Sequence, residues 1–209
     1  MCMLCGRDRV ERAALPGEAT TPMTETYYTN LCAYAKAFVA LTPDRERLLC
    51  TLGPAVRPHL DAVTDRLYSH LQTISRTAPF LEGRLPTLRR THRAWLEEVF
   101  TATYDSAYVE RMYHVGDAHV RVNLPVEFMA GGMTAIADAL MPVVVRLTAE
   151  DVERQIAALG AVNAALGFAL IVMQESYQIS RLLSEQDKFL AITGLSRTTF
   201  NNLAATHAT

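Results

Sequence analysis

The longest apolar run in this sequence extends from Ile156 to Met173 and is apolar apart from Asn163. A helix of this length approaches the ~20 residues that cross a bilayer, so it must be buried either in lipid or in a protein core. Gly160 and Gly167 interrupt the run, and the residues just before it are strongly charged. The preceding apolar segment carries Asp138 at its centre, where a carboxylate would be costly in lipid. We therefore expect two buried helices of a bundle and no membrane span.

The composition fits one all-α domain. The chain has 209 residues, enough for a single sizeable core, and 50% of them are apolar. No long stretch alternates apolar and polar residues as strands do, so no sheet is expected. The formal charge is −2 and no basic patch is present, which argues against a nucleic-acid partner.

The cysteines and the N-terminus favour a reducing, cytoplasmic location. Cys2, Cys5, Cys32 and Cys50 form no disulfide framework. Cys2 and Cys5 make half of a zinc-type Cys-x-x-Cys arrangement, but no second pair follows to complete a structural site. Residues 1–15 are charged and lack the long apolar core of a signal peptide.

Helical periodicity and capping residues divide the chain into helices. Residues 1–22 mix Gly, Pro, Thr and charges and are expected to form a loosely ordered extension, with Met23 as an alternative start. A stripe at helical spacing comprises Val56, Leu60, Val63, Leu67 and Leu71. Four of the expected helices have ranges: 25–39, 85–100, 125–146 and 149–184, the last with a capping-box-like start at Thr148 and Asp151. Two more lie between the first and second of these. One is capped by Thr42 and begun by Pro43, and the other is opened or bent by Pro54 and carries this stripe.

Each of the last two helices carries apolar residues on more than one face. A helix that packs on a single core needs only one apolar face. The excess is best buried against a second copy of the chain, in an intersubunit four-helix bundle. Small residues at positions 157, 158, 160, 161, 164, 165, 167 and 169 would let the helices approach closely. We therefore expect a homodimer through the helices at about 125–146 and 149–184.

A further stripe places a histidine in the core. Its members at helical spacing are Tyr108, Met112, Val115, His119 and Val122. The imidazole of His119 is thus expected inside, close to a helix end and ahead of Pro125, which suits the first position of the next helix. A buried imidazole needs a partner, either a backbone carbonyl or a metal ion. The residues alone leave both alternatives open.

Two more helices carry candidate polar groups. Tyr68 lies in the helix of the 56–71 stripe, where a buried tyrosine is ordinarily a core residue with its hydroxyl tied to a carbonyl. In the helix at 85–100, one face is formed by Leu88, Thr91, Trp95 and Val99.

The run from His119 to Glu127 resembles the proximal-histidine segment of the globin-coupled sensors, the haem-binding input domains of bacterial signalling proteins. It is closest to the members attached to diguanylate cyclases. Tyr68, Leu88 and Thr91 match further features of the family, and the resemblance spans roughly residues 38 to 184. Asn123 departs from the family's common glycine, but asparagine can adopt a left-handed conformation, so we expect the turn to be preserved.

The resemblance implies a globin-like sensor fold over residues 23–184, with an extra N-terminal helix and two long C-terminal helices that form the dimer bundle. It implies haem b, held without thioether links because no Cys-x-x-Cys-His motif is present. His119 would be the iron ligand, Tyr68 the hydroxyl donor to bound gas, Thr91 a second donor or holder of a water, and Leu88 the control on water entry. His92 is expected to point toward the surface. Further expected haem contacts are Phe80, Trp95, Met112, Val115, Leu124 and Met129.

The function implied by the resemblance is O2 sensing, with CO and NO as further ligands and the signal relayed through the dimer to an output module such as a diguanylate cyclase. No output-domain motif is present, so residues 185–209 are expected to be a linker and the chain itself no enzyme. Two alternatives stay open: a haem-free globin-like module for dimerisation or partner binding, and a protoglobin-like gas-binding protein or store. The tail beyond the globin core favours a sensor over a store.

Overall fold

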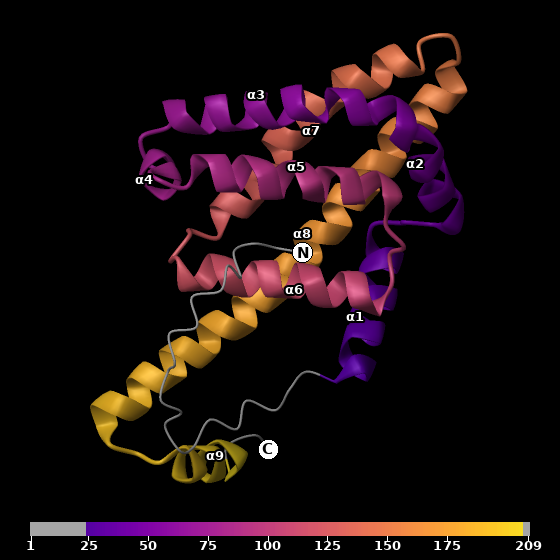
Figure 1. Ribbon diagram of the computed structural model, residues 1–209. Helices are drawn as coiled ribbons and strands as arrows, with labels where there is room; N and C mark the ends of the chain where they lie inside the picture. The colour runs from indigo at the N-terminus through magenta and orange to yellow at the C-terminus, as the bar shows by residue number, and fades with distance from the viewer. Residues whose placement is uncertain (1–23, 207–209) are drawn as a thin grey trace.

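The computed structural model describes residues 24–206, and over this range the chain is helical and contains no strand (Figure 1). The all-α prediction is therefore confirmed. The predicted N-terminal extension, with Cys2 and Cys5, lies outside the described residues. The helices are α1 (Glu25–Phe38), α2 (Pro43–Val56), α3 (Leu60–Thr73), α4 (Ala78–Leu81), α5 (Leu85–Thr101), α6 (Ser106–Arg121), α7 (Glu127–Leu147), α8 (Val152–Thr193) and α9 (Arg197–Thr206).

Side-chain caps begin α2 and α8. The hydroxyl of Thr42 accepts a hydrogen bond from the backbone N–H three residues on, as the sequence predicts. At α8 the cap is Asp151, whose carboxylate accepts from the backbone N–H three residues on at 2.9 Å. The expected capping box with Thr148 is wrong, because Thr148 ends α7 and its hydroxyl donates to the carbonyl of Val144 at 2.8 Å.

Two prolines occupy positions in or near the helices that differ from those the sequence predicts. Pro54 stays inside the last turn of α2 and opens no helix, because a 3-10 turn at Arg57–His59 separates α2 from α3. Pro58 in that turn has no N–H to donate to the carbonyl of Pro54, so the α-helical ladder breaks there. Pro125 is not the first residue of a helix, since α7 begins at Glu127.

The end of α6 explains the position of Pro125. Asn123 has a φ of 53°, in the left-handed region, which confirms the expectation for this residue. Its N–H donates to the carbonyl of Val120, and the N–H of Leu124 donates to the carbonyl of His119, both at 2.9 Å. These two bonds form a Schellman motif, which satisfies carbonyls of the last turn. The connector then extends past Pro125 before α7 starts.

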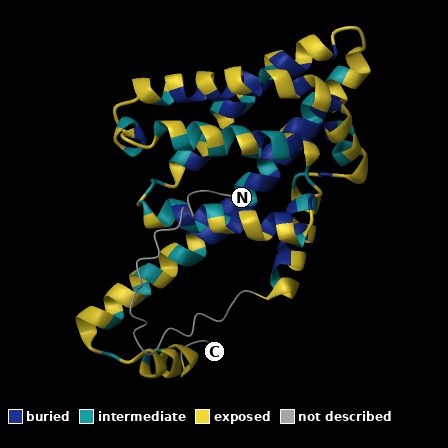
Figure 2. Ribbon diagram, in the orientation of Figure 1, coloured by how far each residue is buried: buried dark blue, intermediate teal, exposed yellow. Residues whose placement is uncertain are grey.

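The helices are arranged around α8 (Figure 1). In this view α3, α5 and α6 lie one below the other, and α8 runs obliquely behind them. Helix α8 packs against α6, α7, α2 and α1, while α3 packs against α5 and α7. The apolar run at 156–173 forms the first half of α8, and most of its side chains are buried in the fold (Figure 2). This burial is what a core helix requires.

Helices α6 and α8 cross in very close contact at Gly116. A Cβ atom at this position would lie 2.4 Å from the carbonyl oxygen of Met173 and 2.8 Å from the Cβ of Ser176. Only glycine therefore allows the two backbones to approach this far.

Polar contacts hold α8 to the segment on both sides of His119. The carboxylate of Asp117 accepts hydrogen bonds from the hydroxyls of Ser176 at 2.6 Å and Ser180 at 2.5 Å. On the other side, the hydroxyl of Tyr177 donates to the carbonyl of Leu124 at 3.0 Å. The last turn of α6 and the connector are thus fastened to one short part of α8.

The C-terminal part of the chain is more helical than the sequence predicts. Helix α8 does not end near Ser184 but continues to Thr193, where Gly194 caps it with a φ of 70°. Helix α9 follows, within the segment that was expected to be a linker. Beyond Tyr177 the helix is largely exposed (Figure 2), and it carries the exposed apolar side chains of Leu182, Leu183, Phe189 and Ile192.

Two helices, α7 and α8, are long and apolar enough to cross a membrane by length and composition. This is weak support for a span, because the core helices of soluble proteins pass the same criterion. More than half of the most apolar window of α8 is buried inside the fold, against α6 and its neighbours.

Candidate functional site

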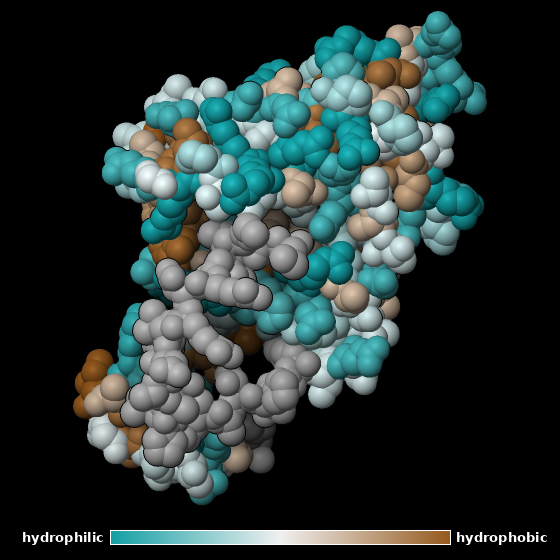
Figure 3. Space-filling model, viewed as in Figure 1, coloured by the Kyte–Doolittle hydropathy of each residue, from teal (hydrophilic) through white to brown (hydrophobic). Residues whose placement is uncertain are grey.

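A cavity of about 240 Å³ lies between α3, α5, α6 and α7, with one contribution from α8. Every predicted haem contact except Phe80 lines it: Tyr68, Leu88, Thr91, Trp95, Met112, Val115, His119, Leu124 and Met129. The rest of the lining is Leu67, His92, Ala94, Glu98, Arg111, Phe128, Gly132, Met133, Ile136 and Met173. Figure 3 shows apolar surface at the left edge of the molecule, below α4.

His119 lies in the last turn of α6 and contributes its ring to the cavity. Its Nδ1 atom is buried and has no hydrogen-bond partner among residues 24–206. Burial lowers the pKa of His119 to about 4, so the imidazole is neutral at pH 7. An ordinary core histidine bonds to a backbone carbonyl, but no carbonyl among the described residues accepts a hydrogen bond from Nδ1 of His119.

Tyr68 reaches the cavity from α3 and is only 7% exposed. Burial raises the pKa of Tyr68 to about 12, so its hydroxyl stays protonated and can donate a hydrogen bond. Its ring packs edge-on against His92, with ring centroids 5.7 Å apart.

His92 lines the cavity, so the expectation that it points toward the surface is wrong. Both ring nitrogens are buried, and neither has a hydrogen-bond partner in the described part of the chain. Burial lowers the pKa of His92 to about 4, so this imidazole is neutral as well. The sequence did contain the signal, since His92 lies four residues after Leu88 and three before Trp95, on the same face of α5.

Thr91 also lines the cavity, but its hydroxyl bonds within its own helix. It donates to the carbonyls of Thr87 and Leu88, each at 3.1 Å. Threonine commonly makes such bonds inside helices. The proton of this hydroxyl is therefore shared with the backbone of α5, while the Thr91 side chain still adds bulk to the cavity wall.

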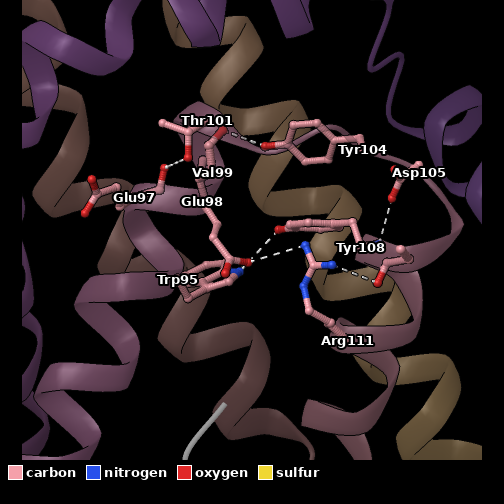
Figure 4. Close-up of polar contacts among 10 residues, drawn as sticks. Trp95, Glu97, Glu98, Val99, Thr101, Tyr104, Asp105, Tyr108 and Arg111 are labelled. Atoms are coloured by element: carbon pink, nitrogen blue, oxygen red, sulfur yellow. Dashed lines mark hydrogen bonds and ion pairs between the residues drawn. The ribbon is translucent and has the colours of Figure 1, made fainter. Parts of the chain in front are cut away.

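A polar cluster between α5 and α6 forms one end of the cavity (Figure 4). The indole N–H of Trp95 donates to the hydroxyl of Tyr108 at 3.3 Å, which orients the tryptophan ring. Arg111 lies over the ring of Tyr108, 5.5 Å from its centroid, and forms an ion pair with Glu98 at 3.8 Å. Both charged side chains are partly exposed, so the charge lies at the solvent-facing end and the interior stays apolar.

Phe80, predicted at the rim of the haem, does not line the cavity. It lies in the short helix α4, and its ring packs edge-on against Phe128 with centroids 5.7 Å apart. Phe128 does line the cavity, and Arg76 lies over the same ring at 5.7 Å. Phe128 was not among the expected haem contacts, because nothing in the local sequence pattern shows which side of α7 faces the cavity.

The family comparison agrees with this geometry. A family model described as Protoglobin matches residues 29–182. The chain belongs to the protoglobin family. The matched range contains all the residues that line the cavity of this protoglobin. A search of curated proteins found no match to it.

Solved structures agree with the assignment of this protoglobin to the globin sensor domains. The globin domain of a Geobacter sulfurreducens globin-coupled sensor is 28% identical, with a TM-score of 0.65, and the match covers 69% of this chain and 96% of that one. The globin domain of E. coli DosC, in ferric and ferrous forms, is 18% and 17% identical, with TM-scores of 0.57 and 0.56. Each DosC match covers 72% of this chain and 97% of the other, and at this identity it shows the fold alone.

The cavity of this protoglobin fits an iron porphyrin. Its walls are mostly apolar, and two neutral imidazoles with unpartnered buried nitrogens reach it. Within residues 24–206 no three His, Cys, Asp or Glu side chains converge as a site made by protein alone would need. An iron held here would take most of its ligands from the porphyrin and the remainder from imidazole.

Proposed function

We propose that this protoglobin is the cytoplasmic input domain of a haem-based O2 sensor. It would hold haem b through His119, bind O2 and also CO and NO, and pass the ligation state through a homodimer interface to an output module such as a diguanylate cyclase. One observation carries the proposal. The neutral imidazole of His119 on α6 and the protonated hydroxyl of Tyr68 on α3 share one apolar cavity in a globin sensor fold.

When bound, haem would supply an iron that can take up a diatomic gas. His119 would provide the nitrogen that holds the iron, and being neutral it would not have to release a proton first. The Schellman turn after His119 and the contacts of α8 fix the backbone on both sides of this ring. Met112 and Val115, on the same face of α6, would keep water away from it.

Tyr68 would hold the gas molecule. Its hydroxyl donor lies in a cavity with apolar walls, where a hydrogen bond is stronger than in water. A gas that gains partial negative charge on binding, as O2 does, benefits from such a donor, and CO benefits less. Leu88 would limit the entry of water.

Replacing Tyr68 with phenylalanine is expected to speed O2 release by about 5- to 30-fold, which corresponds to one neutral hydrogen bond of about 1–2 kcal/mol. Stopped-flow displacement of O2 by excess CO measures this rate. Tyr104→Phe is a matched control, because Tyr104 is also buried but donates to the carbonyl of Val99 and does not line the cavity. An unchanged O2 release rate in the Tyr68 variant would remove this residue from the gas site.

Absorption spectroscopy tests the proposed function as a whole. Purified protein mixed with one equivalent of haem should show a Soret band that survives gel filtration, and the reduced form should change its spectrum reversibly with O2. A protein that keeps no haem would instead be the globin-like dimerisation module. A protein that binds haem and O2 but remains monomeric would be a gas-binding protein or store.

Exposed apolar residues support a dimer through α7 and α8. Val145 near the end of α7 is 39% exposed, and Ile156 in the first turns of α8 is 67% exposed. Such side chains gain free energy when a second copy removes them from water. The double variant Val145→Glu, Ile156→Glu is therefore expected to be monomeric in light scattering coupled to gel filtration, where the parent is dimeric. Phe38→Glu on α1 changes an equally exposed apolar residue elsewhere and should leave the dimer intact.

A further inference from the structure

One permanent positive charge lines the cavity. Among the described residues of its wall, Arg111 is the single lysine or arginine, and Glu98 is the single acid. Charged side chains are rarely placed beside apolar walls unless they have a partner there. The guanidinium of Arg111 is always protonated, so the space beside it attracts a negatively charged group.

The ion pair between these two residues is a loose one. The Nη2 atom of Arg111 lies 3.8 Å from the Oε2 atom of Glu98, beyond the roughly 2.7–2.9 Å of a charge-assisted hydrogen bond. The two side chains are 45% and 33% exposed, so water screens the attraction. Such a pair contributes little to stability, and Arg111 can therefore exchange Glu98 for a better placed carboxylate at small cost.

Neighbouring contacts hold the side chain of Arg111 at the cavity wall. Its guanidinium lies over the ring of Tyr108, and its Nη1 atom donates to the carbonyl of Ala107 at 3.2 Å. The hydroxyl of Tyr108 is itself fixed by the indole N–H of Trp95 (Figure 4). A guanidinium carries five N–H donors, so these contacts leave donors for a further carboxylate. The cation is thus preorganised and only partly used.

We infer that Arg111 binds a carboxylate on the edge of the porphyrin and releases Glu98 when it does so. The inference rests on the proposed function, because haem b would carry this carboxylate on one of its two propionate side chains. The apolar walls suit the ring, and the charged, solvent-facing end of the cavity suits the propionates. No covalent bond forms or breaks, since the arginine only changes its partner. Glu98 then lies close to a second negative charge, so it opposes binding and lowers the affinity for haem.

A comparison of haem with its dimethyl ester isolates this contact, because the ester keeps the iron and the ring but has no carboxylate. Trp95 is the one tryptophan of the chain and lines the cavity, so quenching of its fluorescence reports how tightly each porphyrin binds. We expect Arg111→Met to bind haem about 5- to 20-fold more weakly than the parent. The same variant should bind the ester as tightly as the parent does.

Glu98→Gln tests the exchange of partners. The amide has the shape of the acid but no charge, so this variant should bind haem about 2- to 5-fold more tightly than the parent, with no change for the ester. Arg57→Met is the matched control, because Arg57 pairs with Glu97, next to Glu98 on α5, and does not line the cavity. It should bind both porphyrins as the parent does. Equal haem affinity in Glu98→Gln and the parent would contradict the release of Glu98.

The melting temperature of the haem-free protein separates a binding residue from a structural one. A loose, partly exposed ion pair adds little stability, so haem-free Arg111→Met should melt within about 2 °C of the parent. A larger fall, together with weaker binding of haem and ester alike, would make Arg111 a support of the fold and overturn the inference. Unchanged affinity for both porphyrins in Arg111→Met would also overturn it and leave the proposed function standing. A parent that binds neither porphyrin would overturn both.

Discussion

The double variant His119→Gly, His92→Leu is expected to lose its haem, with retention reduced by more than ~100-fold. Removing a neighbour of a metal ligand already costs about 10–100-fold in metal affinity, and this variant removes both imidazoles that line the cavity. Glycine leaves open the space that the imidazole of His119 occupied in the last turn of α6. Transfer of haem from the variant to an excess of apomyoglobin measures the retention.

Added imidazole turns this loss into a test of the bond. Free imidazole can enter the space left by the side chain, so it should restore a Soret band and an imidazole-type spectrum to the double variant. His114→Ala is the matched control, because His114 is on the same helix, is exposed and does not line the cavity. An imidazole-type spectrum in the double variant without added imidazole would reassign the axial ligand to another residue.

Gly116→Val is expected to have the second largest effect, this time on folding. The first added carbon would lie 2.4 Å from a backbone oxygen of α8, so a helix has to move to accommodate it. Forced overpacking costs about 1–3 kcal/mol and more where backbone is involved. For a domain of this size, 3 kcal/mol lowers the melting temperature by roughly 6–12 °C.

Gly131→Ala provides the contrast for this prediction. Gly131 is also helical, but a Cβ there would meet no atom within 4 Å, so alanine should be neutral or stabilise by up to about 1 kcal/mol. Thermal unfolding followed by circular dichroism compares the two variants. Equal melting temperatures for Gly116→Val and the parent would show that α6 and α8 separate easily at this crossing.

The helices of the core were predictable because their signals are local. The cap at Thr42 lies where the sequence pattern puts it, and α5 and α7 end within a few residues of their expected bounds. The failures occur where the outcome depends on the neighbouring backbone. Pro54 could open a helix or end one, and only the proline four residues later decides which.

The positions of site residues were predictable where the residue belongs to the family motif, and they were less predictable for the other residues. His119 and Tyr68 line the cavity as the motif implies. His92 was misplaced, although it shares a helix face with Leu88, because spacing alone does not fix how α5 is rotated about its axis. That rotation is set by the packing of α5 on α2 and α3, which are distant in sequence. Phe80 lies away from the cavity for a similar reason, since a helix as short as α4 takes its position from its neighbours.

The attachment of α8 around His119 has a mechanical consequence. Asp117 and Leu124 are both fastened to residues 176–180, so α8 must follow any displacement of the ring that lies between them. From Tyr177 the helix continues to Thr193 as a rod of about 24 Å, at 1.5 Å per residue. A tilt of about 5° at Tyr177 would move the far end of this rod by about 2 Å. The protein thus contains a lever arm whose short end is the last turn of α6, which carries His119.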